Sequence, residues 1–237
     1  MFLMRRPSNA EIERFLDRSH NLPLSYGPTG IVRHRSRVDR LDEQVVTIGH
    51  GEVDFERARL ALAGWKHFDI GWVEAFPKQP SIDAGTDVAV LIRHLGFWSL
   101  NGARVLYDVG GTDRHAAFGF AYGTLTNHAE SGEELFEVFI DSDSGAVKYR
   151  IRAVSWPQSL LTWIGQPFVR FLQARFRRDS AAAMKRATSG VRFDHEHLRR
   201  DSRARSDGSA LGAHSDPCAS RAVGSQVFTD RIPPAHR

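Results

Sequence analysis

Four titratable side chains cluster around one predicted turn of the chain: His128, Glu130, Glu133 and Glu134. A histidine beside a carboxylate can act as a general acid and base, because the carboxylate raises the imidazole pKa toward neutrality. Tyr122 precedes His128 by six residues, so both side chains would lie on the same face of a straight strand. We therefore take His128 and Glu134 as candidate catalytic residues. Two alternatives stay open, because the same groups could recognise the polar head of a bound molecule or only form and solvate a turn.

The same residue types could also bind a metal, and the candidate ligands are His50, His128, Glu130 and Glu134. Their spacing matches no metal motif such as His-Glu-x-x-His, and the His-Glu-His string at 195–197 lacks the fixed geometry that a site needs. The Gly-His-Gly string at 49–51 lacks the Lys-Ser/Thr ending of a phosphate loop and the third glycine of a dinucleotide fingerprint, which favours a tight turn. Cys218 has no activating neighbour, and no nucleophile-elbow string is present. We predict neither a metal nor a cofactor.

Aromatic residues could line a pocket for a flat or lipid-like molecule, since each supplies a large apolar contact area. Most of them must fill the core. The residues that we assign to a ligand site are Trp65, Phe120, Tyr122, His128, Glu134 and Phe136. The wider aromatic set also contains Trp72, Trp98, Phe118 and Trp156. The prediction depends on the set rather than on any one member.

The elements that would position this site lie in a segment with a period of two, from residue 71 to residue 154. Turns that contain glycine or serine separate six predicted strands, at 72–76, 86–95, 103–109, 116–126, 133–140 and 146–154. In the last strand Val147, Tyr149 and Ile151 alternate with basic residues, which predicts one buried and one solvated face. The pattern predicts an antiparallel meander that is curved and sheltered on one side.

Two shorter segments precede the meander. Residues 9–16 have one apolar helical face, with Ser8 as a predicted N-cap, and a proline- and glycine-containing arm follows. Residues 45–48 are typical of a strand, and Asp54 is the predicted N-cap of the next helix. Residues 1–40 would pack on the domain as a helix and an arm.

A long amphipathic helix is predicted after Pro167, which fits the first turn of a helix. Its Phe168, Phe171 and Leu172 are expected to lie against the sheet. Residues 160–187 hold six Lys or Arg against one Asp. Such a face is usually solvated, and the alternatives are weak contact with an anionic membrane surface or contact with nucleic acid. Because the aromatic residues belong to the buried face and do not interleave with the basic ones, no nucleic-acid partner is predicted.

Composition sets the class of protein. The chain has 237 residues, of which 41% are hydrophobic and 25% charged, with a net charge of +4, and this is typical of one or two globular domains. The single cysteine excludes an internal disulfide framework. Neither a signal peptide nor an apolar run of about 18 residues is found, so we expect no membrane span and a cytoplasmic location. Residues 189–237 have few aliphatic side chains, which predicts a disordered tail.

Several strings of the chain resemble the family called DUF1990. They are Phe-Ala-Tyr-Gly-Thr-Leu at 120–125, Gly-Glu-Glu-Leu-Phe at 132–136, Ser-Trp-Pro at 155–157, Gly-Gln-Pro at 165–167, and Arg170, Gln173 and Phe176. The resemblance implies one domain at residues 1–188 and carries no assigned activity to this chain. The element order is similar to that of helix-grip, START-like domains, in which a curved antiparallel sheet wraps a long C-terminal helix around an internal cavity.

The elements alone also favour this α+β fold, because the sheltered face of a sheet of about six to seven strands needs a cover, and the helix at 168–187 is the longest apolar-faced element. We expect the domain to bind a small hydrophobic or amphipathic molecule in a cavity between sheet and helix. One alternative is an enzyme that acts on such a ligand by acid-base chemistry, with His128 and a neighbouring Glu. The other is a protein-interaction module with a filled core. An open internal space would favour the first two, and a hydrogen bond from His128 to a carboxylate would favour the enzyme.

Overall fold

The structure is a computed structural model in which residues 1–33, 41–110, 117–157 and 166–189 are described. Its helices are α1 (Asn9–Ser19), α2 (Gly51–Ala63), the short 3-10 helix η2 (Lys66–Phe68) and α4 (Gln166–Ser189). Its strands are β1 (Phe2–Leu3), β2 (Asp42–His50), β3 (Val73–Phe76), β4 (Asp87–Arg93), β5 (Trp98–Val109), β6 (Ala117–Thr124), β7 (Glu130–Ile140) and β8 (Ala146–Pro157). The predicted disordered tail at 189–237 lies outside the described residues, except that Ser189 ends α4.

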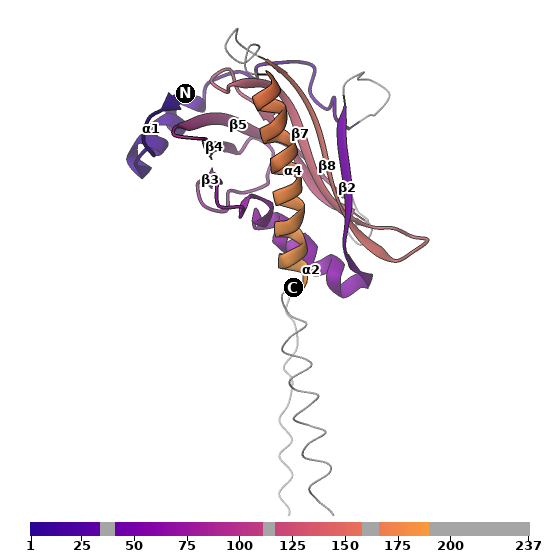
Figure 1. Ribbon diagram of the computed structural model, residues 1–237. Coiled ribbons are helices and arrows are strands. Elements are labelled where there is room, and N and C mark those ends of the chain that lie inside the picture. Colours follow the sequence, from indigo (N-terminus) through magenta and orange to yellow (C-terminus); the bar gives the residue numbers. More distant parts are fainter. Residues whose placement is uncertain (34–40, 111–116, 158–165, 190–237) are drawn as a thin grey trace, which may run out of the picture. The chain divides into compact units, whose positions relative to one another are not determined.

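Within the described residues, eight strands form one antiparallel sheet in the order β2-β8-β7-β6-β5-β4-β3, and β1 pairs with β5. From β3 to β8 each strand pairs with the next one along the chain, which confirms the predicted meander. Strand β2 pairs with β8 and extends that edge of the sheet. The sheet curls, α4 lies across it, and α2 lies near the C-terminal end of α4 (Figure 1). The architecture is the predicted α+β helix-grip arrangement.

Strand alternation determines which side chains of β8 face α4. Tyr149 and Ile151 are buried, and the Tyr149 hydroxyl lies 2.9 Å from the Ser180 hydroxyl of α4. The predicted buried face of this strand is therefore confirmed. The opposite face carries ion pairs rather than isolated solvated charges, because Arg150 donates to Glu137 on β7 at 2.8 Å.

Strand β5 begins at Trp98, well before the predicted start at residue 103. Ser99 and Asn101 interrupt the apolar pattern that the prediction used, but both are almost completely buried. Strand β4 pairs with this stretch, so that Ile92 stands opposite Ser99. Pairing with β4 on one edge, and of Ser99 with Phe2 of β1 on the other, therefore keeps these buried polar residues in a strand.

Helix α4 packs through residues spaced four apart along its axis, which include Leu172, Phe176 and the fully buried Met184. The prediction that Phe171 lies against the sheet is wrong, because its side chain is 60% exposed. It is rotated from Leu172 by about 100° around the helix axis. Phe168 is 37% exposed and lies only partly inward, in the first turns of the helix. In the part of the chain that the structure describes, no helix is long and apolar enough to cross a membrane.

Helix starts follow the local sequence with one exception. Ser8 caps α1 as predicted, and Glu11 completes a capping box by accepting the Ser8 N–H at 2.8 Å. Asp54 is not the N-cap of α2, because the helix begins earlier and His50 occupies the cap. The Asp54 carboxylate instead accepts the His50 N–H at 3.0 Å from within the first turn, where the helix dipole favours a negative charge. Pro167 lies in the first turn of α4, as expected.

Candidate functional site

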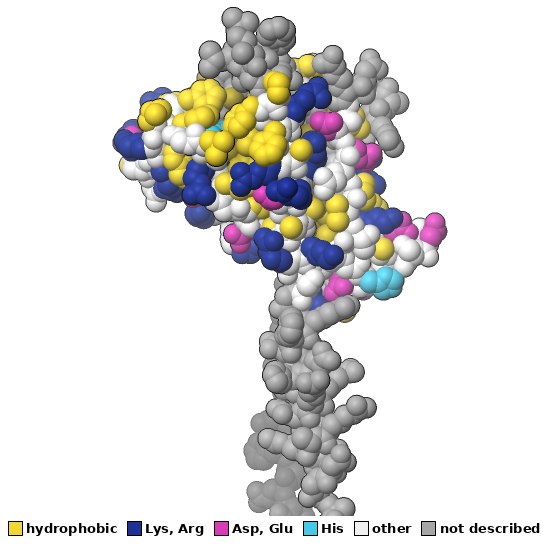
Figure 2. Space-filling model, in the orientation of Figure 1, with side chains coloured by type: hydrophobic (Ala, Val, Ile, Leu, Met, Phe, Trp, Pro, Cys, Tyr) yellow, Lys and Arg dark blue, Asp and Glu magenta, His cyan; other side chains and the backbone are white. Residues whose placement is uncertain are grey.

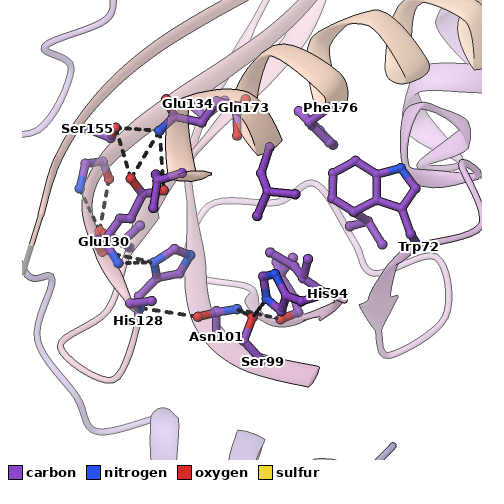
Figure 3. A pocket seen from close by; sticks show the side chains of 18 of the residues that line it. Trp72, His94, Ser99, Asn101, His128, Glu130, Glu134, Ser155, Gln173 and Phe176 are labelled. Atoms are coloured by element: carbon purple, nitrogen blue, oxygen red, sulfur yellow. Dashed lines mark hydrogen bonds between the residues drawn. The ribbon is translucent and has the colours of Figure 1, made fainter. Parts of the chain in front are cut away.

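A cavity of about 690 Å³ lies between the sheet and α4. Its apolar wall includes Phe68, Trp72, Val90, Ile92, Leu172 and Phe176. Its polar wall includes Ser99, Asn101, Tyr122, His128, Glu130, Glu134, Ser155 and Gln173. The acidic residues and His128 gather at one side of the cavity, and Trp72 and Phe176 lie at the other (Figure 3). An open space is therefore present between the sheet and α4, which favours the ligand-binding and enzyme hypotheses over a filled core.

Glu134 on β7 and Tyr122 on β6 stand opposite each other in the sheet. The Tyr122 hydroxyl donates to Glu134 Oε2 at 2.6 Å. Burial raises the pKa of Glu134 to about 7, although the hydrogen bond from Tyr122 opposes the shift. Burial and the neighbouring carboxylate raise the pKa of Tyr122 well above its usual range. Tyr122 therefore stays a hydrogen-bond donor, while near neutral pH Glu134 exists both as the acid and as the carboxylate.

Glu130, at the start of β7, connects the sheet to α4. Gln173 of α4 donates to Glu130 Oε1 at 3.1 Å and to the Ser155 hydroxyl on β8 at 2.9 Å. Burial raises the pKa of Glu130 above its ordinary value, although these polar neighbours oppose the shift. Glu130 and Glu134 thus present two carboxyl groups at the same end of the cavity (Figure 3).

His128 lies in the turn between β6 and β7, where its backbone N–H donates to the Leu125 carbonyl at 2.9 Å. Its Nδ1 lies 2.9 Å from the Glu130 carbonyl oxygen and 3.0 Å from the Glu130 backbone nitrogen. Burial lowers the pKa of His128 to about 4. The expectation that a carboxylate raises this pKa is therefore wrong: among the described residues, the polar contacts of the ring go to the Glu130 backbone.

A second polar chain fixes the turn that carries His128. The Asn101 side chain accepts the Ala129 N–H at 3.2 Å and donates to the Ser99 hydroxyl at 3.0 Å. His94 Nε2 lies 2.8 Å from the same hydroxyl. Asn101 therefore ties β5 to the turn after β6, and the hydrogen bonds lead from the Ala129 N–H, next to His128, through Asn101 and Ser99 to His94 (Figure 3).

The predicted aromatic ligand residues separate into two places. Tyr122 lines the cavity. Phe120 and Phe136 are fully buried in the core, with ring centroids 5.8 Å apart, and Trp65 is 4% exposed and donates from its indole to the Pro80 carbonyl at 2.8 Å. These three residues lie outside the cavity wall, and Phe136 contacts the Tyr122 ring at 5.7 Å. They support the site from beneath, and the assignment of the whole set to a ligand stays a prediction.

Glu133 belongs to the other face of the sheet, because neighbouring residues of a strand point in opposite directions. Its carboxylate accepts hydrogen bonds from the Tyr26 and Tyr107 hydroxyls, both at 2.7 Å, and from the Gly30 N–H at 2.8 Å. Glu133 therefore fastens the N-terminal arm to the sheet. Of the adjacent acids, Glu134 is the one whose side chain faces the cavity.

His50, the remaining candidate metal ligand, caps α2 and does not contribute to the cavity wall. Across the described ranges, no group of three or more His, Cys, Asp or Glu residues is arranged to hold a metal ion. Cys218 and the His-Glu-His string at 195–197 lie outside these ranges.

Sequence reasoning missed several polar residues of the site, above all Gln173, Ser155, Ser99 and Asn101. Two signals were available, because Gln173 and Ser155 both belong to the strings that resemble DUF1990. Ser99 and Asn101 gave no such signal, since they lie where no strand was predicted. Their roles depend on sheet pairing that only the three-dimensional structure supplies.

Comparison with known proteins gives matches over most of the chain. A family model described as a domain of unknown function, DUF1990, matches residues 26–183. A UPF0548 protein of Dictyostelium discoideum is 33% identical over 206 residues, which cover 79% of this chain and 95% of the relative. A UPF0548 protein of Deinococcus radiodurans is 35% identical over 200 residues, which cover 79% of this chain and 98% of the relative.

Solved structures give a more distant similarity. Human STARD10 is 11% identical with a TM-score of 0.40, and the match covers 87% of this chain and 91% of that one. Ara h 8.0201 is 12% identical with a TM-score of 0.39, and the match covers 64% of this chain and 98% of that one.

Proposed function

Because the chain belongs to the DUF1990 family, as its sequence strings predict, we propose its function from the geometry of the cavity: it binds one small hydrophobic or amphipathic molecule between the sheet and α4. The observation that carries the proposal is an apolar cavity of about 690 Å³ with polar groups at one end. Pockets for small molecules commonly have this size and this division between an apolar wall and a few placed polar groups.

The polar end favours a ligand whose head group donates hydrogen bonds. Glu130 and Glu134 supply carboxyl oxygens as acceptors, and Arg177 in the wall is engaged with Asp42 at 3.5 Å. A carboxylate head group would place a third acid beside two others, which is unfavourable in a site that excludes water. We therefore propose an alcohol or an amine as the head group.

The expected affinity is modest. Apolar burial contributes about 25 cal/mol per Å², so a ligand that buries about 300 Å² gains about 7 kcal/mol before the costs of association reduce it. Micromolar binding is the realistic expectation.

The direct test is calorimetric titration with three molecules that share one alkyl chain and differ only in the head group. The alcohol and the amine should bind, and the carboxylic acid should bind at least about tenfold more weakly, because it lacks a donor when ionised. Glu134→Gln should weaken binding of the amine and improve binding of the acid. Glu13→Gln on the exposed face of α1 serves as the matched control. Equal binding of the acid and the amine, or no binding of any of the three, would contradict the proposal.

An enzyme that uses Glu134 is the second candidate function. It is favoured by the position of Glu134, whose carboxyl lies in the cavity wall 2.6 Å from the Tyr122 hydroxyl. Burial raises its pKa to about 7, and a pKa near the working pH suits proton transfer. His128 is a weak candidate base, because burial lowers its pKa to about 4. If Glu134 transfers protons, Glu134→Gln should preserve ligand binding and abolish product formation, whereas a recognition role changes binding alone.

A further inference from the structure

The mouth of the cavity carries an exposed apolar surface, which we call the mouth patch. Its members are the exposed cavity-lining residues Phe2, Met4, Leu95 and Phe168, together with the exposed Phe171, which follows Phe168 by about one turn of α4. Met4 is 87% exposed and Leu95 is 84% exposed. Figure 2 shows hydrophobic side chains gathered on this face, over the beginning of α4 and the N-terminal segment. Soluble monomers rarely expose large apolar side chains in such a group, so the patch indicates a binding surface.

Contacts between separate segments hold the mouth patch together. Strand β1 pairs with β5, so that Leu3 stands opposite Trp98. The Phe2 ring packs on Phe97 with centroids 5.8 Å apart. His94 stacks on Phe97 at 4.5 Å and lies 6.3 Å from the Phe168 ring of α4. The patch is therefore preformed by the fold rather than assembled from independent loops.

Basic residues adjoin the mouth patch. Within two residues of its members in sequence lie Arg5, Arg6, Arg93 and Arg170. On α4, Arg175 packs on Trp72 of the cavity wall, and Arg178 follows it by three residues. Among the described residues, Arg5 pairs with Glu11 and Arg6 pairs with Glu74, whereas Arg175 and Arg178 share Asp179. Figure 2 shows Lys and Arg side chains directly beside the hydrophobic ones. The face therefore combines protruding apolar groups with a positive charge.

We propose that the mouth patch docks on the surface of an anionic lipid bilayer, with Met4 and Leu95 inserted between the headgroups. This combination of apolar and basic side chains is what an anionic membrane surface binds. Leu95 lies at the tip of the turn between β4 and β5, where Gly96 has φ of 88°, and Met4 follows β1. Protruding tips suit a deformable bilayer better than the matched, flatter surface of a protein partner.

The path into the cavity also favours a bilayer that lies against the mouth patch. Phe2, Met4, Leu95 and Phe168 belong both to the mouth patch and to the cavity wall. A docked bilayer would therefore cover the mouth, and apolar surface would continue from the lipid into the interior. The proposal concerns the docking surface alone and does not depend on which molecule the cavity binds.

The test is flotation of the full chain with vesicles of phosphatidylcholine alone and with vesicles that also contain phosphatidylserine. Wild type should bind the anionic vesicles and lose binding in high salt. The double variant Met4→Glu with Leu95→Glu should lower the bound fraction at least about tenfold, because it removes two inserting groups and adds two negative charges. The matched control is Val53→Glu with Leu60→Glu, which changes two exposed apolar residues of α2 and the charge by the same amount.

The control should bind as wild type does, and thermal unfolding should show that both double variants are folded. Arg93→Gln should weaken binding to the anionic vesicles without changing the melting temperature. Three results would overturn the proposal: no binding by wild type, equal loss in both double variants, or sedimentation that shows a dimer of wild type and a monomer of the Met4/Leu95 variant. The last result would assign the mouth patch to a second copy of the chain.

Discussion

At the scale of single residues, burial is the main cause of the shifted pKa values of His67 and Glu134. His67 is completely buried, its ring lies 4.4 Å from Phe136 and 4.6 Å from Phe68, and burial lowers its pKa to about 3. Among the described residues neither ring nitrogen has a hydrogen-bond partner. The pKa of Glu134 is shifted in the opposite direction, upward. Burial disfavours the charged form of both groups, which lowers the pKa of a base and raises the pKa of an acid.

His67 predicts a loss of stability in acid. The unfolded chain binds a proton at His67 near the ordinary pKa of 6.5, but the folded chain does so only near 3, so the free energy of unfolding falls as the pH falls between these values. In His67→Phe this linkage is absent. Wild type should therefore lose about 2 kcal/mol more than the variant between about pH 6 and pH 4. Urea unfolding at both pH values measures the difference, and equal losses would show that His67 is not buried as a neutral ring.

The raised pKa of Glu134 predicts a loss of stability as the pH rises. Its folded pKa of about 7 exceeds the ordinary value of 4.5, so its contribution is fully present below 4.5 and is lost as the pH rises through 7. Glu134→Gln keeps an acceptor for Tyr122 and does not titrate. The variant should gain up to about 2 kcal/mol relative to wild type between about pH 5 and pH 8. Denaturant unfolding checks this, with Glu13→Gln as control, and a constant difference would place the Glu134 carboxyl in water.

At the scale of elements, the rotation of α4 determines what the sheet encloses. Phe176 packs inward, 5.5 Å from Phe68 and 6.2 Å from Phe136, whereas Phe171 is 60% exposed. Gln173 lies between them in sequence and binds Glu130. A rotation that buried Phe171 would therefore also remove the clamp between α4 and β7.

Two alanine substitutions in α4 test this rotation. Phe176→Ala should destabilise the protein by about 3 kcal/mol, because it removes a packed aromatic side chain and leaves a cavity. Phe171→Ala should cost less than about 1 kcal/mol, as exposed positions usually do. Chemical denaturation of both variants gives the comparison, and a larger cost for Phe171→Ala would mean that the other face of α4 is inward.

The sequence pattern predicts the elements well where apolar alternation is uninterrupted, as at Tyr149 and Ile151 of β8. It fails where polar residues are buried, as at Ser99 of β5, because pairing with a neighbouring strand cannot be read from one segment. The site shows the same division. Tyr122 and Glu134 were found from residue type and spacing, but the choice between Glu133 and Glu134 as the residue that faces the cavity depends on register, and the partners of Glu134 depend on β6.

At the scale of the whole molecule, the meander and α4 enclose a cavity beside a packed hydrophobic core. The sheet supplies both acids and His128 at one end, α4 supplies Gln173, and the mouth patch surrounds the entrance. The aromatic core around Phe136 supports the sheet. We propose that the polar end of the cavity binds the head group of a ligand and that the mouth patch docks on a lipid surface. A cytoplasmic location stays a prediction from composition.

Truncation after residue 190 tests the boundary of the domain. The composition of residues 189–237 predicts little buried surface, so removal should leave the melting temperature within about one or two degrees of the full chain. Calorimetry or a dye-based thermal scan measures the shift. Loss of cooperative unfolding would show that the tail is part of the folded unit.

The most direct test of ligand binding in the cavity is native mass spectrometry of the protein purified from its own host. We expect a noncovalent complex with one small molecule, which is released on unfolding. The complex should be absent from Val90→Trp, because the larger side chain at the cavity wall fills part of the binding space. Leu60→Trp on the exposed side of α2 should retain the molecule. A wild-type protein that carries nothing, or a molecule that persists in Val90→Trp, would contradict the claim that this cavity is the binding site.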